Sequence, residues 1–356
     1  MELCARWTAL GSFHPFSRNH NNLDSPAQET YVWPKVVSVG QKFIGMRHRL
    51  LPYIYTLGYH AHSEGLPIAR SLLMEFPTDT VTHNIDHQFM LGDALLVTPV
   101  VNKGATTVTG YFPRGTWYNI FYYDQILTSG VYLTFDVTIF DMPVHIRGGT
   151  IVAMHQPALT TTFARLTPFD VLIALPVNGI AAGDLYLDDG ETVRNPNATI
   201  VKFTAVEGTF TSIVLQNDYA DACMTLVNKV VILGVKLSPS RVSIALFLST
   251  TLARSDWRLV LQMLTRQLPR TSRSFGISFV GWQYIIWRST YKIIPVKWLE
   301  EAHACAQSLE CLDAEFWSSN SELQRGLQVD QSPESTNSSN KYDIIQQSIS
   351  TLTRIT

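Results

Sequence analysis

The stretch HPFSRNHNNL, residues 14–23, brings together three side chains that could bind a polar ligand. Arg18, Asn19 and His20 follow an apolar run, and two further asparagines follow them. A neutral imidazole offers one hydrogen-bond donor and one acceptor, so it suits a pair of adjacent hydroxyl groups. We expect residues 12–18 to form a short buried strand whose end presents these polar side chains at the edge of a site.

The composition favours a globular protein of two or three domains. The chain has 356 residues, of which 46% are hydrophobic and 16% charged, enough for several cores. A net charge of −2 gives no reason to expect nucleic acid or a membrane surface as a partner. The four cysteines lack the spacing of a metal site or a disulfide framework. We expect no cofactor.

Targeting signals are not evident in the sequence. The N-terminus, MELCARW, lacks the apolar segment of a signal peptide. The most apolar part of the tail, residues 275–287, is too short to span a membrane as a helix. The compartment is therefore left open.

A helical pattern follows the asparagine-rich segment, from about residue 35 to 63. Pro34 is well placed to begin a helix, and Pro52 predicts a kink or a break within it. Gly65 and Pro67 are expected to end it. Apolar residues recur at intervals of three and four on one helix face, namely Phe43, Met46, Leu50, Ile54 and Leu57.

Short runs typical of β-strands alternate with turn dipeptides from about residue 84 to 235. Strands at this density with few helical patterns indicate all-β sandwiches, and the length suffices for two, with a boundary near 154–168. Beyond Ser243 we find no clean strand alternation. Residues 254–297 carry eight Arg or Lys against one acid, and the Ser/Asn-rich run at 332–341 indicates disorder.

Five segments resemble, in order, the late catalytic and C-terminal regions of glycoside hydrolase family 31, the family of acid α-glucosidases and intestinal maltases. They are ELCARWTALGSFHPFSRNHN, RHRLLPYIYTLGYHAHSEGLPIARSLLMEFPTD, IDHQFMLGDALLVTPVVNKGATTVTGYFPRGTWYN, MPVHIRGGTIVAMHQPALTTTFAR and LYLDDGET. Together they cover roughly residues 2–243. So many matches in register specify a family far better than one motif does.

The resemblance implies a (β/α)₈ barrel followed by two C-terminal β-sandwiches. Residues 12–20 then look like the last barrel strand, and 35–64 like its final helix. Most of the barrel of a family member would precede Glu2, and a mis-joined gene model explains the tail better than a genuine extension. We expect four parts: a barrel remnant at 1–69, a proximal sandwich at 70–155, a distal sandwich at 156–243, and an unassigned, partly disordered tail at 244–356.

The resemblance also assigns roles around His20. In the family this histidine hydrogen-bonds hydroxyls of the glucose being cleaved, at the C-terminal end of a barrel strand; Arg18 is expected to support the strand end. Hydrolysis with retention needs two carboxyl groups about 5–5.5 Å apart, and the family's two catalytic aspartates have no counterpart here. Asp24 and Glu29 match no catalytic motif. We therefore expect no catalytic residue and an inactive isolated chain.

Two other clusters could suggest a metal, but neither has suitable spacing. In LDDGET, Asp189 and Gly190 are typical of a tight turn between strands, without the alternating oxygen ligands of a calcium loop. His60 and His62 lie two residues apart, so they do not share a helix face well, even with Glu64 nearby. We predict no metal site.

Asn197 and Asn337 each begin an Asn-X-Ser/Thr triplet and are candidate N-glycosylation sites. They matter if a longer parent protein is secreted, lysosomal, vacuolar or resident in the endoplasmic reticulum, as many members of the family are.

Three functions remain open. The favoured one is the C-terminal part of a retaining α-glucosidase, acting on terminal α-linked glucose of maltose, oligosaccharides or glycans when joined to the rest of its barrel. The alternative is a non-catalytic carbohydrate-binding or scaffold module, although Trp117 in GTWYN is more typical of a core. The third is binding of an anionic surface by Arg266, Arg270 and Arg273, yet such charges usually face solvent.

Overall fold

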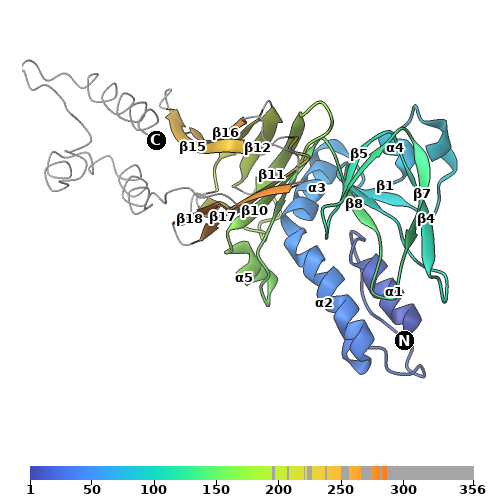
Figure 1. The fold of residues 1–356 in the computed structure, drawn as a ribbon. Helices are drawn as coiled ribbons and strands as arrows, with labels where there is room; N and C mark the ends of the chain where they lie inside the picture. The colour runs from blue at the N-terminus through green and yellow to red at the C-terminus, as the bar shows by residue number, and fades with distance from the viewer. Residues whose placement is uncertain are drawn as a thin grey trace, which may run out of the picture. The chain divides into compact units, whose positions relative to one another are not determined.

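Helices begin the chain, and β-strands make up most of its later elements (Figure 1). In this computed structural model, the strands that lie past residue 236 are described by their backbone. No helix among the described residues is both long and apolar enough to cross a membrane. The described residues are 1–194, 197–206, 208–219, 221–222, 227–236, 239–249, 256–265, 274–280 and 283–286.

The predicted break in the helical region is confirmed. Pro34 begins the first of two helices, and Pro52 lies in the first turn of the second, since its ring would clash with a carbonyl inside a continuous helix. Gly65 ends that helix with a φ of 76°. The helices are α1 (Glu2–Gly11), α2 (Pro34–Arg49), α3 (Leu51–Glu64), α4 (Leu72–Glu75) and α5 (Thr161–Arg165), with 3₁₀ turns η1 (Thr30–Val32) and η2 (Thr80–Asn84).

The predicted strand at residues 12–18 is wrong. Instead α1 runs into a turn, in which the amide of Phe13 donates to the carbonyl of Leu10 at 3.0 Å and that of His14 to Gly11 at 3.2 Å. A barrel strand is hydrogen-bonded to a neighbour on each side, and no strand of the described chain flanks this segment. Its backbone groups therefore need other partners.

The first β region contains a six-stranded antiparallel sheet and a two-stranded one. The buried indole of Trp117, 1% exposed, packs edge-on against Phe112 and donates to the carbonyl of Pro113 at 3.0 Å, so its predicted place in the core is confirmed. The six strands, in order, are β1 (Ala69–Arg70), β2 (Phe89–Leu91), β3 (Leu95–Val97), β8 (Val144–Arg147), β5 (Gly115–Asn119) and β6 (Gln125–Thr128); β4 (Thr107–Phe112) pairs with β7 (Val131–Asp136).

A ten-stranded mixed sheet comes next along the chain. It begins directly after β8, so the chain passes from one sheet to the next at Gly148 and Gly149. Strands also continue past Ser243, contrary to expectation: two of them, at 256–265 and 274–280, pair with earlier strands of this sheet, at 209–217 and 227–233. In order they are β15 (Pro239–Ser249), β16 (Asp256–Thr265), β13 (Thr209–Asn217), β12 (Thr199–Val206), β11 (Ala181–Leu187), β9 (Thr150–Met154), β10 (Phe169–Ala174), β14 (Val227–Leu233), β17 (Ser274–Val280) and β18 (Gln283–Ile286).

Helices α1, α2 and α3 share one core with both β regions. Along β10, Leu172 and Ala174 join the cluster that contains α1, α2 and α3, whereas Val171 and Ile173 join a second cluster on the opposite face. This period of two means that the middle of the ten-stranded sheet is buried on both faces. The described residues all fall within the unit Met1–Ile293.

Candidate functional site

The segment between α1 and α2 has an anchored beginning and an exposed tip. Phe13 is fully buried and meets Phe43 of α2 edge-on, with ring centroids 6.4 Å apart. The His14 ring lies 5.7 Å from that of Phe89 in β2. From Phe16, which is 77% exposed, the chain projects toward solvent. The apolar run therefore anchors the polar tip, although it does so without forming a strand.

Arg47 of α2 supplies the partners that a neighbouring strand would have given. Its guanidinium donates to the carbonyls of Ser12 at 3.0 Å, His14 at 2.5 Å and Pro15 at 2.9 Å. Burial, together with the positive charge of Arg47, lowers the pKa of His14. The sequence pattern did not reveal Arg47, because it lies 35 residues from Ser12 and occupies an ordinary polar position of a helix.

The tip is closed by a pair of side-chain amides. The Gln28 Nε2 donates to the His20 carbonyl at 2.7 Å and to the Asn19 Oδ1 at 3.1 Å. In return, the Asn19 Nδ2 donates to the Gln28 carbonyl at 2.8 Å. Inside this pair, the Asn21 Nδ2 donates to the Pro26 carbonyl at 3.0 Å. Residues 19–28 thus form an exposed but closed loop.

The side chains of Arg18 and His20 are both exposed at this tip. Within the described chain, neither the guanidinium nor the imidazole has a hydrogen-bond partner. Arg47 and Gln28 bind the backbone of the segment on either side of Arg18. Asp24 is exposed on the same loop. The His20 imidazole is accordingly available to a ligand as both donor and acceptor.

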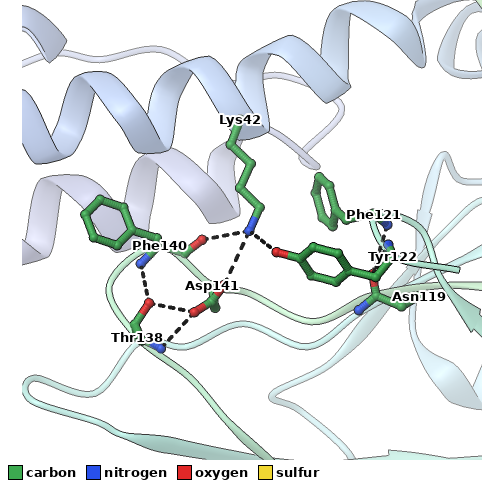
Figure 2. Close-up of polar contacts among 7 residues, drawn as sticks. All are labelled: Lys42, Asn119, Phe121, Tyr122, Thr138, Phe140 and Asp141. Carbon is green, nitrogen blue, oxygen red and sulfur yellow. Dashed lines mark hydrogen bonds and ion pairs between the residues drawn. The ribbon is translucent and has the colours of Figure 1, made fainter. Parts of the chain in front are cut away.

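Helix α2 is itself fixed to the first β region by Lys42, as Figure 2 shows. The Nζ donates to the Tyr122 hydroxyl at 3.2 Å, the Phe140 carbonyl at 3.0 Å and the Asp141 Oδ1 at 3.3 Å. Burial opposes ionisation of Asp141, but hydrogen bonds from Thr138 and the charge of Lys42 lower its pKa. The helix that carries Arg47 is therefore held in place by loops far along the chain.

His60 lies between two carboxylates and links α3 to β11. Its Nδ1 is 2.8 Å from the Glu64 Oε1, and its Nε2 is 2.6 Å from the Asp184 Oδ2. Burial opposes protonation, but the two carboxylates outweigh it and raise the pKa of His60. Because they bind opposite sides of the ring, they do not converge on one point. No group of three or more His, Cys, Asp or Glu in the described ranges is arranged to hold a metal ion.

The LDDGET segment forms a turn, but not a two-residue hairpin. Asp188 is buried and accepts from the Tyr55 hydroxyl at 2.7 Å. Asp189 accepts from the Thr192 amide at 2.9 Å, and with other local hydrogen bonds this lowers the pKa of Asp189 to about 2. The turn opens a longer connection over residues 188–198, since β12 begins only at Thr199. The Asp189 carboxylate stabilises the turn, and the Asp188 carboxylate binds Tyr55 of α3.

The other candidate residues fall into two groups. Asn197 is exposed in the connection between β11 and β12. Asn337 and the three arginines of the proposed anionic-surface site, Arg266, Arg270 and Arg273, lie outside the described residues.

Comparisons with known proteins find two family models that match parts of this chain. The TIM-barrel domain of the glycosyl hydrolases of family 31 matches residues 1–57, and the C-terminal domain of that family matches residues 65–152. Residues 1–57 and 65–152 are therefore similar to two consecutive domains of glycoside hydrolase family 31. His20 and Arg47 both lie within the part of the chain that matches the barrel.

Relatives in this family are substantially longer than the chain. An α-glucosidase from Hordeum vulgare is 41% identical over 246 residues, which cover 65% of this chain and 28% of the relative. Lysosomal α-glucosidase from Mus musculus is 38% identical over 263 residues, covering 68% and 28%. A crystal structure of the glucosidase II α subunit matches with a TM-score of 0.64 and 25% identity, over 74% of this chain and 31% of that one. The chain thus spans less than a third of these proteins.

Proposed function

We propose that the chain acts as the C-terminal part of a retaining α-glucosidase, in which His20 contacts the hydroxyls of a terminal α-linked glucose. The substrate would be maltose, an oligosaccharide or a glycan. The observation that carries the proposal is the exposed imidazole of His20, which has no hydrogen-bond partner in the described chain and lies within the match to a family 31 barrel.

The remaining chemistry requires groups that the described part of the chain does not bring to His20. Retention uses one carboxyl group as nucleophile and another as acid and base, about 5–5.5 Å apart. Asp24 and Glu29, which are nearest to His20 in sequence, are exposed and match no catalytic motif. In the proposed enzyme, both catalytic carboxylates come from earlier strands of a complete barrel. The chain alone would be inactive, whereas its sugar-binding side chain would already be in place.

The domain organisation proposed for this enzyme is a barrel remnant at 1–69, a proximal sandwich, a distal sandwich and a tail. Separate apolar clusters on the two sides of β9 and β10, and a third around Trp117, support two β domains. The alternative function, a carbohydrate-binding module, loses its candidate platform because the Trp117 ring is buried. The enzyme is therefore the better proposal.

The test uses a chimaera in which this chain replaces the matching part of the Hordeum vulgare α-glucosidase. The purified chain should release no nitrophenol from p-nitrophenyl α-glucoside, and the chimaera should release it. His20→Ala in the chimaera should lower kcat/KM by on the order of 100-fold, since the imidazole replaces two hydrogen bonds to water with two to sugar.

The matched control is His87→Ala, which removes an exposed histidine of the C-terminal domain. This variant should keep the activity of the chimaera. Two results would contradict the proposal: release of nitrophenol by the chain alone, or a folded chimaera whose activity is insensitive to His20→Ala.

A further inference from the structure

We propose that Gln28 and Arg47 are positioning residues for His20. Gln28 fixes the backbone of His20 itself, and Arg47 anchors the start of the segment that carries it. The inference rests on the proposed function, because it concerns the side chain assigned there to sugar binding. Neither residue would touch the substrate.

Gln28 acts on His20 directly. A glutamine amide has two N–H donors, and here they serve the His20 carbonyl at 2.7 Å and the Asn19 Oδ1 at 3.1 Å. The Asn19 amide returns a bond to the Gln28 carbonyl, so the two residues lock the ends of the loop to each other. The backbone of His20 is therefore held, while its imidazole is left free.

Arg47 acts at the other end of the segment. Its planar guanidinium reaches three carbonyls between Ser12 and Pro15, which a lysine, with one compact charge on a flexible stem, could not match in geometry. The anchor lies five residues before His20 in sequence. Lys42 binds the same helix to the first β region. The segment that leads to His20 is therefore connected to the core through α2.

This arrangement matters because the loop carrying His20 is exposed and no strand of the described residues pairs with it. A side chain that must meet two hydroxyl groups needs placement within about 0.5 Å. If sugar binding had to order this loop, the entropic cost of ordering would reduce the affinity for the sugar. Two side-chain anchors, one on each side of His20, supply the order beforehand.

The first test measures order in the complete chain without substrate. Gln28→Glu keeps the shape of the side chain but replaces its donating NH₂ group with an oxygen. That oxygen would face two other acceptors, the His20 carbonyl and the Asn19 Oδ1. By ¹⁵N relaxation, the order parameter of the His20 amide should fall from about 0.85 to about 0.6 or lower. Ser25→Asp adds the same charge to the same loop, at an exposed position, and should leave the value unchanged.

Arg47 has a matched control on its own helix. Arg47→Lys should lower the order parameters of the segment that begins at Ser12. Arg49→Lys alters another arginine of α2, which pairs with Asp170 in β10 at 2.9 Å, and should leave that segment rigid. If Gln28→Glu and Arg47→Lys leave the His20 amide as rigid as in the native chain, the inference is wrong.

The second test measures kinetics in the chimaera with p-nitrophenyl α-glucoside. Gln28→Glu should lower kcat/KM on the order of tenfold, the value of one or two hydrogen bonds, mainly through KM and with an unchanged melting temperature. A merely structural role would lower the melting temperature and leave KM unaltered. If His20→Ala lowers activity but Gln28→Glu does not, this inference fails alone; if neither variant matters, the proposed function fails first.

Discussion

The burial of two histidines leads us to expect that the folded chain loses stability as the pH falls below about 6.5. His145 in β8 is 1% exposed, meets Phe112 edge-on at 4.8 Å, and has no hydrogen-bond partner for Nδ1. Burial lowers the pKa of His145 to about 3. His155 stacks on Phe169, and burial, with a contribution from the charge of Arg165, lowers its pKa to about 4.

The sign is set by proton binding in the two states. Unfolded histidine binds a proton near pH 6.5, whereas the folded chain keeps both rings neutral until the pH is far lower. The free energy of unfolding therefore falls with falling pH, by about 1.4 kcal/mol per pH unit for each histidine. For His145, the fall between pH 6.5 and about 3 amounts to about 5 kcal/mol, comparable with the whole stability of many domains.

The assay is urea unfolding followed by circular dichroism at pH 7.5, 6.0, 5.5 and 5.0, a range in which few carboxylates titrate. His145→Gln removes the titrating ring and keeps a polar side chain. It should reduce the slope of unfolding free energy against pH by about 1.4 kcal/mol per pH unit between 6.0 and 5.0. This holds however much the substitution lowers the unfolding free energy at pH 7.5. His87→Gln, at an exposed histidine, should keep the native slope.

Two observations would refute this reasoning. One is a His145→Gln variant with the native slope. The other is an NMR titration in which the His145 Cε1 proton shifts with a midpoint near 6.5, which would mean that water reaches the ring in the folded chain.

Three further predictions concern packing and charge. Phe13→Ala should destabilise the chain by about 3–5 kcal/mol, because the ring is fully buried; an unchanged urea midpoint would show that the segment is not packed. Gly183→Ala should abolish soluble expression, since a Cβ there overlaps the carbonyl oxygen of Ile151, whereas Gly45→Ala, with open space around it, should be tolerated. Because the pKa of His60 is raised in the folded chain, its protonation adds to the free energy of unfolding. This contribution is fully present below about pH 6.5 and is lost as the pH rises through the pKa of the folded state. His60→Gln should thus flatten the decline in stability between pH 6.5 and 8.5, and an equally steep decline would contradict the role of the two carboxylates.

Local signals predicted the features that depend on local physics. Pro52 breaks the helical region because it removes one hydrogen bond and clashes with one turn. Trp117 is buried, as its strand context indicates. The predicted strand at residues 12–18 is wrong for the opposite reason: an apolar run becomes a strand only beside other strands, and the described chain provides none there.

The candidate site divides in the same way. The exposed tip with His20 is predicted by an apolar run that ends in polar residues, and the resemblance to the family supplies its role. Its supports could not be read from the sequence, because the contact between Arg47 and Ser12 joins residues 35 apart. The bond from Gln28 to His20 spans only eight residues, but it links an amide to a backbone carbonyl, which no residue pattern encodes.

The contacts that hold α1, α2 and α3 allow the order of the His20 segment to be tested separately from the proposed hydrolysis. Helix α1 buries Ala5 and Ala9 but leaves Leu3 and Trp7 67% and 53% exposed, so the remnant does not rely on that face for its place. Instead α2 and α3 share a core with both β regions. The anchors of His20 therefore depend on contacts within the described chain. In the proposed enzyme, the two carboxyl groups of the retaining mechanism come from other strands of the barrel. Order at His20 should accordingly be native-like in the isolated chain, and hydrolysis should require the rest of the barrel.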